Sequence, residues 1–194
     1  MITSIEKNTG KIKPRYEGRR VTREEYLDLP EDGFQYDMIE GVLHMSPSAY
    51  FEHGFAAASF FGILKSWVIG KGAGYITIET DIFLPDGGDV LRPDISFILE
   101  KNKHIIIGHI HGTPDLVCEV LPDSTKERDI GAKAARYLTN GVKEYWILNP
   151  ADKSIHVWFN RASVWDKKTA AVLHSELLPG LQISTNDIYG GLPE

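Results

Sequence analysis

The chain has 194 residues, 42% of them hydrophobic and 25% charged, and these values suit one compact domain with a substantial core. The single cysteine, Cys118, excludes an intramolecular disulfide framework and favours a reducing compartment. The net charge of −6 argues against a large nucleic-acid-binding surface, but it does not exclude an enzyme that brings a cation to a phosphodiester.

The first 20 residues are polar and basic, and they lack the apolar core of a secretory signal. We expect a flexible arm over residues 1–20, followed by a single domain over 21–194. The longest apolar stretch, FAAASFFGIL, is too short to span a bilayer, so we expect a cytoplasmic protein with no membrane partner.

The first half of the domain predicts a short helix, two strands and a long helix. Thr22 and Glu25 form a capping box that opens the short helix. Residues 31–47 read as two strands around a turn at Glu40 and Gly41. Residues 53–70 are apolar at helical spacing, which predicts a well-buried helix whose stripe comprises Phe55, Ser59, Gly62, Ile63 and Trp67.

The second half is mainly of β character. We expect strands at 75–84, 94–99 and 115–121, a helix capped by Ser124 and Glu127 that stops at Asn140-Gly141, and a hairpin over 142–159. The tail reads as a short strand and closing turns. Because strands and helices interleave, we predict an α/β (α+β) fold. It has a mixed central β-sheet flanked by helices, an added N-terminal β segment and a C-terminal hairpin.

Two acidic residues occupy unusual places in these strands. Glu119 lies near the end of an apolar strand, on the face opposite Cys118, and Asp94 begins its own strand directly after Pro93. If the two strands are neighbours, both carboxylates converge on one point. Carboxylates held close together repel each other unless a cation lies between them, and Mg²⁺ or Mn²⁺ suits such oxygen ligands.

The helix after Glu119 offers a lysine. Asp129 and Lys133 share one helix face, with Tyr137 a turn further on, and small residues around Lys133 would let that face approach the sheet. A lysine beside two metal-binding acids could orient a water and stabilise developing charge. Alternatively, Asp129 and Lys133 form a surface ion pair, Asp94 caps a turn, and Glu119 pairs with an arginine.

The segments RPDISFIL and PDLVCEVLPDSTKERDIGAKAARYLTNGVKEYWILNP resemble the Uma2 family of restriction endonucleases, which belongs to the PD-(D/E)XK nuclease superfamily. The string GVKEYWILNP is the most specific match, and the likeness runs from about Thr22 to Asn186. The resemblance implies a restriction-endonuclease-like fold, a Mg²⁺-dependent phosphodiesterase site and DNA as substrate.

Position by position, the resemblance makes Asp94 and Glu119 metal ligands, with the backbone carbonyl of Val120 as a further ligand. The superfamily lysine normally follows the second acid by two residues, where this chain has Leu121. The resemblance implies that in this family the lysine has moved to the following helix, where it matches Lys133. The chain departs from the family pattern in three places, which are Pro122, Asn149 and Asp37.

The residues and the resemblance together predict a Mg²⁺- or Mn²⁺-dependent DNA endonuclease with Asp94, Glu119 and Lys133 as catalytic residues. A second group would support them: Asp37, His53, Asp129 and Tyr137. Exposed aromatic residues on the hairpin, with Trp158 among them, would suit a homodimer. Two rivals keep the same fold, namely a catalytically inactive nucleic-acid-binding module and a protein-interaction module.

Overall fold

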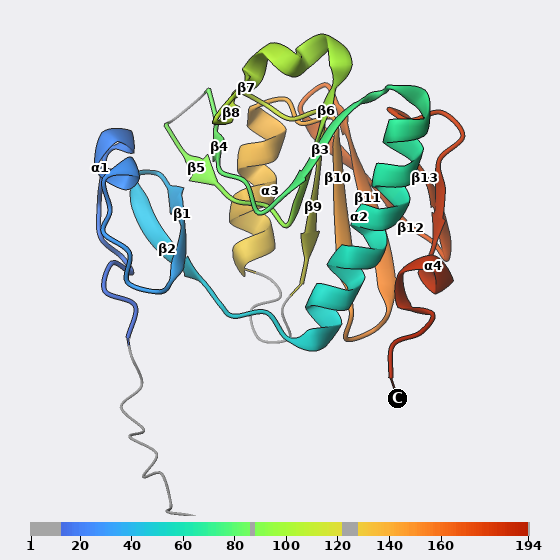
Figure 1. Cartoon of the computed structure of the whole chain (residues 1–194), viewed down its shortest axis with the longest axis horizontal. Helices are drawn as coiled ribbons and strands as arrows, with labels where there is room; N and C mark the ends of the chain where they lie inside the picture. The colour runs from blue at the N-terminus through green and yellow to red at the C-terminus, as the bar shows by residue number, and fades with distance from the viewer. Residues whose placement is uncertain (1–12, 86–87, 122–127, 194) are drawn as a thin grey trace, which may run out of the picture.

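The computed structural model describes residues 13–85, 88–121 and 128–193 (Figure 1). A mixed sheet of six strands forms its centre. In spatial order these strands are β12 (Val164–Thr169), β11 (Ser154–Arg161), β10 (Glu144–Asn149), β9 (Leu116–Val120), β6 (Ile95–Leu99) and β3 (Gly74–Ile78). Strands β9 and β10 are parallel and the other neighbours are antiparallel.

Two helices cover the opposite faces of this sheet, as Figure 1 shows. α2 (Phe51–Lys71) packs on the face to which Cys118 points, and its Phe60 ring contacts Trp146 at a centroid distance of 5.4 Å. α3 (Arg128–Thr139) packs on the face to which Val117 points. The alternation of side chains along β9 therefore directs Glu119 toward α3, because residues two apart share a face.

A second six-stranded sheet contains the expected N-terminal β segment. It comprises β2 (Val42–Ser46), β1 (Gln35–Ile39), β5 (Val90–Leu91), β4 (Ile82–Phe83), β8 (His109–His111) and β7 (Ile106–Ile107). The β1–β2 hairpin and α1 (Arg23–Leu27) stand at one end of the molecule in Figure 1. The capping box of Thr22 and Glu25 is confirmed. Packed structure begins before residue 21, because Tyr16 is buried and Gly18 donates to the Leu43 carbonyl.

Two predictions in the middle of the chain are wrong in detail. The expected strand over 75–84 is two strands in different sheets, because Glu79 turns the backbone with a φ of 43°. The long helix is confirmed, but its fully buried stripe lies one residue further along than predicted. Gly62 is exposed, and the buried side chains are Ala56, Phe60, Leu64 and Val68.

The remaining elements complete the main core. The hairpin of β10 and β11 is confirmed and is extended by β12. The tail contains β13 (Val172–His174), β14 (Gln182–Ser184) and a helix, α4 (Thr185–Tyr189), where closing turns were expected. A 3-10 helix, η1 (Glu100–Ile105), follows β6. Thr139 ends α3 and Gly141 follows with a φ of 85°, as predicted, whereas the predicted cap at Ser124 and Glu127 lies outside the described residues.

The hairpin aromatics do not form the exposed surface on which a homodimer was predicted. Tyr145 and Trp146 are fully buried, and Trp158 is half-buried against Tyr145 and Trp165. A homodimer stays a prediction without that support. Among the described residues, no helix is both long and apolar enough to cross a membrane.

Candidate active site

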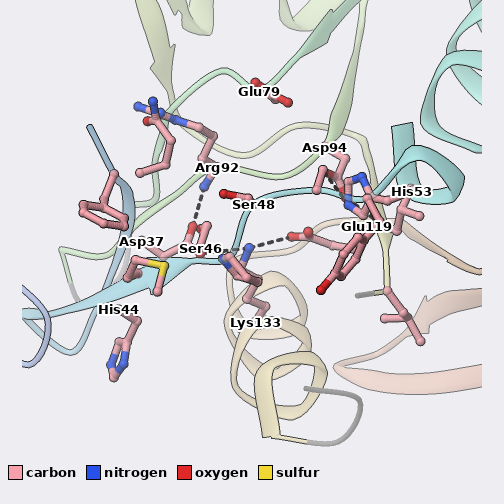
Figure 2. Close-up of a pocket in the computed structure, with 18 of the residues that line it drawn as sticks. Asp37, His44, Ser46, Ser48, His53, Glu79, Arg92, Asp94, Glu119 and Lys133 are labelled. Carbon is pink, nitrogen blue, oxygen red and sulfur yellow. Dashed lines mark hydrogen bonds and ion pairs between the residues drawn. The ribbon is translucent and has the colours of Figure 1, made fainter. Parts of the chain in front are cut away.

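A cavity of about 380 Å³ lies where the two sheets meet α2 and α3. Its wall includes Asp37 of β1, His53 of α2, Asp94 before β6, Glu119 of β9 and Lys133 of α3. Five segments that are distant in sequence thus bring polar side chains to one place, and Figure 2 shows them facing a common space.

Asp94 is positioned by the antiparallel pairing of β6 and β9. The register places Ile95 opposite Cys118, so the residue before β6 lies beside the end of β9. The Val120 amide donates to Asp94 Oδ2 at 2.6 Å, and His53 Nε2 lies 3.3 Å from Asp94 Oδ1. Pro93 has no amide hydrogen, but it lies before β6 and therefore removes no hydrogen bond from the sheet. Asp94 is therefore held by both its oxygens at the cavity wall.

Glu119, Lys133 and Asp37 form a connected group across the cavity, drawn in Figure 2. Lys133 Nζ lies 3.1 Å from Glu119 Oε1 and 2.9 Å from Asp37 Oδ2. The Tyr137 hydroxyl donates to Glu119 Oε1 at 2.8 Å, and the Arg92 amide donates to Asp37 Oδ1 at 2.8 Å. Lys133 therefore joins the main sheet to the N-terminal hairpin through two carboxylates.

Burial and mutual charge determine the protonation of this group. Burial raises the pKa of Glu119 to about 7, and the charges of Asp94 and Asp37 add to the rise while Lys133 opposes it. Burial lowers the pKa of Lys133, but the charges of Asp37 and Glu119 outweigh burial and raise that pKa overall. Lys133 is consequently a fixed cation. When Glu119 is ionised, three carboxylates face one lysine, and the site carries excess negative charge.

The histidine beside Asp94 is also biased toward its charged form. Burial lowers the pKa of His53, but the hydrogen bond and the charge of Asp94 outweigh burial, so the pKa lies above its ordinary value. His53 comes from the first turn of α2 and lies beside Asp94 (Figure 2). It is suited to fix the orientation of the Asp94 carboxylate.

The donor set fits a hard divalent cation. Among the hydrogen bonds of the described residues, Glu119 Oε2 accepts none, and the surrounding charge is negative. The part of the chain that the structure describes contains no cluster of three or more His, Cys, Asp or Glu residues able to hold a metal by themselves. Mg²⁺ does not require such a cluster, because it is usually bound through one or two carboxylates, with waters and substrate phosphates completing its octahedron.

The structure brings together most of the residues predicted from the sequence. Asp94, Glu119, Lys133, Asp37 and His53 all line the cavity, and Tyr137 supports Glu119 from behind. The supporting role of Asp129 stays a prediction, because the side chain of Asp129 lies outside the described residues. Lys133 is not a surface residue as in the alternative reading, since its side chain is mostly buried and pairs with Asp37 and Glu119.

Val120 and Arg92 also contribute to the site. Val120 lines the cavity and its amide holds Asp94, whereas the role of its carbonyl as a metal ligand stays a prediction. Sequence reasoning missed Arg92, whose amide orients Asp37 and whose side chain pairs with Asp81 at 2.6 Å. Its position directly before Pro93 and Asp94 was the available signal.

A family model, Uma2, described as "Putative restriction endonuclease", matches residues 23–186. The chain belongs to the Uma2 family. A solved structure with a similar fold is described as a "putative nuclease belonging to DUF820" from Anabaena variabilis ATCC 29413. The two chains are 19% identical with a TM-score of 0.75, over 88% of this chain and 98% of that one. A comparison with curated proteins finds no match. Family and fold together class this Uma2 member among the restriction-endonuclease-like nucleases.

The raised pKa of Glu119 predicts how the stability of the metal-free protein depends on pH. Between pH 4.5, the ordinary pKa of a glutamate, and about pH 7, the folded protein holds a proton that the unfolded chain has lost. The free energy of unfolding should therefore fall as pH rises through this window, by about 3 kcal/mol for the full shift. Denaturant unfolding at pH 5, 6, 7 and 8 in a chelating buffer measures it. A flat profile in this window, with Glu119→Gln equally flat, would contradict the assignment.

Two buried tyrosines near Glu119 provide a matched pair for mutation. The Tyr137 hydroxyl donates to Glu119, whereas the buried Tyr145 hydroxyl has no hydrogen-bond partner among the described residues. Tyr137→Phe should destabilise the protein by about 1–2 kcal/mol at pH 8, and Tyr145→Phe should cost nothing or stabilise it. Chemical denaturation of both variants tests this contrast. Equal losses would show that the two hydroxyls do not differ.

Proposed function

We propose that this chain is a Mg²⁺- or Mn²⁺-dependent endonuclease that hydrolyses phosphodiester bonds in DNA. The observation that supports this most is the convergence of Asp94, Glu119 and Lys133 in one cavity, with Glu119 Oε2 left for a ligand. Membership of the Uma2 family supports the reaction class. The metal, the DNA substrate and the residue roles are the parts proposed.

In this proposal Asp94 and Glu119 hold the metal, with the Val120 carbonyl as a further ligand. When bound, the metal would lower the pKa of a water and polarise the phosphoryl oxygen. His53 keeps the Asp94 carboxylate in place through its contact at 3.3 Å. Asp129, from α3, is a supporting residue in this proposal.

Lys133 acts as a positive charge and not as a base. Its raised pKa keeps it protonated across the physiological range, so it can donate hydrogen bonds but cannot accept a proton there. Its place between Asp37 and Glu119 lets it orient a water and offset the charge that develops on the phosphate. Asp37 fixes Lys133 and is a positioning residue.

The test combines metal binding with cleavage. Mg²⁺ and Mn²⁺ are titrated into the wild type and an Asp94→Ala, Glu119→Ala double variant, and cleavage of plasmid and single-stranded DNA is followed in the same samples. Metal binding and nicking that both vanish in the double variant would support the proposal.

Two other results would overturn it. Cleavage that survives in the double variant would place the chemistry elsewhere. A wild type that binds no divalent ion, even with DNA present, would favour the inactive modules. Salt-sensitive DNA binding would then identify a nucleic-acid-binding module, and its absence a protein-interaction module.

A further inference from the structure

The wall of the cavity also includes apolar and aromatic side chains. Among them are Phe34 before β1, Met45 of β2, and Pro47 and Tyr50 of the segment that joins β2 to α2. Phe34 and Met45 are partly buried, and their contacts belong to the small core of the N-terminal hairpin. Tyr50 is different, because 66% of it is exposed. A large aromatic side chain thus stands open to solvent on the wall of the candidate active site.

The charges around the cavity do not suit a groove that follows the phosphates of a duplex. In the described part of its wall, the only Arg and Lys residues are Arg92 and Lys133, and both are ion-paired, with Asp81 and with Asp37 and Glu119 respectively. Acidic residues outnumber them: Asp37, Glu52, Glu79, Asp94 and Glu119. A duplex is held mainly through its phosphates by basic side chains. This wall offers no such unpaired lysine or arginine in the described residues.

Nucleic acid can be held in another way, by stacking of unpaired bases on aromatic side chains. Every base has a π face, so this contact needs no cation and little sequence preference. The cavity volume of about 380 Å³ lies within the range of small-molecule sites, which suits one or two nucleotides better than a duplex segment. A base on Tyr50 would place the adjoining backbone in the same cavity as Asp94 and Glu119.

We propose that the part of the cavity wall at Tyr50 is a nucleobase subsite, and that the substrate is unpaired DNA, either single-stranded or locally opened. This inference rests on the proposed function and names its substrate class. Tyr50 is then the residue that selects unpaired bases, and the charged group in the same cavity holds the scissile phosphate.

Phe51 provides a matched control. It follows Tyr50 directly and is 64% exposed, but it does not line the cavity and its ring contacts Phe55 instead. The binding of a fluorescent single-stranded oligonucleotide is measured with Ca²⁺ present, for the wild type, Tyr50→Ala, Tyr50→Phe and Phe51→Ala. The same oligonucleotide with abasic sites, and the matching duplex, are measured alongside. Circular dichroism checks that each variant is folded.

Tyr50→Ala should weaken binding of the single strand about tenfold, while Tyr50→Phe and Phe51→Ala stay within about twofold of the wild type. The abasic strand should bind the wild type as weakly as the intact strand binds Tyr50→Ala. Equal losses in Tyr50→Ala and Phe51→Ala, tight abasic binding, or a preference for the duplex would overturn the subsite.

Cleavage, measured with Mg²⁺ on the same strands, separates this inference from the proposed function. Tyr50-dependent binding without any cleavage would leave the subsite standing and reject the nuclease. Cleavage that depends on Glu119 but prefers the duplex would support the nuclease and reject the subsite.

Discussion

Glu119→Gln should lower DNA cleavage on the order of 10²–10³-fold and, in the metal-free protein at pH 8, raise the free energy of unfolding by about 2–3 kcal/mol. The two effects have one cause. Burial and the neighbouring charges of Asp94 and Asp37 make the ionised Glu119 costly, and the glutamine resembles the protonated acid. The negative charge that would bind a cation also destabilises the folded protein when no metal is bound.

The experiment follows cleavage in Mg²⁺ and denaturant unfolding with chelator on the same preparations. Glu144→Gln is a control, because Glu144 is also buried but binds Trp146, Ser175 and the amide of Leu177, away from the cavity. That variant should lose stability, since Glu144 accepts hydrogen bonds from both side chains and backbone. Glu119→Gln that is both active and less stable at pH 8 would refute the prediction.

Lys133→Met should lose both stability and activity. The methionine has a similar length and no charge, so it leaves Asp37, Asp94 and Glu119 facing one another without their cation. Removing one partner of a buried ion pair costs about 3–5 kcal/mol, because the other charges remain buried. Cleavage should fall on the order of 10²–10³-fold, since Lys133 is proposed to offset developing charge.

A double-variant cycle identifies the source of the stability loss. Adding Asp37→Asn to Lys133→Met removes one of the uncompensated carboxylates, so part of the stability should return while activity stays low. Unfolding at pH 8 in chelator measures the four proteins. Additive losses in the cycle would indicate that Lys133 and Asp37 are not coupled.

Much of the fold follows from local patterns. The capping box at Thr22, the β1–β2 hairpin and the alternation along β9 were predicted because each depends on neighbours in sequence. The proximity of Asp94 and Glu119 followed from one assumption, that their strands are neighbours. The positions were predictable, whereas the catalytic roles of these residues remain to be tested.

The errors arose where distant segments decide the structure. The sequence 75–84 alternates throughout, but Glu79 adopts a positive φ and the chain passes from one sheet to the other. The buried stripe of α2 could not be located because apolar residues surround the helix, and only the sheet selects the face. The pairing of Lys133 with Asp37 joins a helix that covers the main sheet to a strand of the other sheet, for which the sequence contains no local signal.

Lys133 links α3 to the β1–β2 hairpin as well as to Glu119. The site is therefore complete only while the N-terminal hairpin is docked on the main sheet. Had the lysine stood at Leu121, directly after β9, both acids and the lysine would have belonged to the main sheet, and the hairpin would have been dispensable to the site. Assembly of the charged group in the cavity therefore depends on the docking of the N-terminal hairpin. Warming that loosens the hairpin would inactivate the enzyme before the main sheet unfolds.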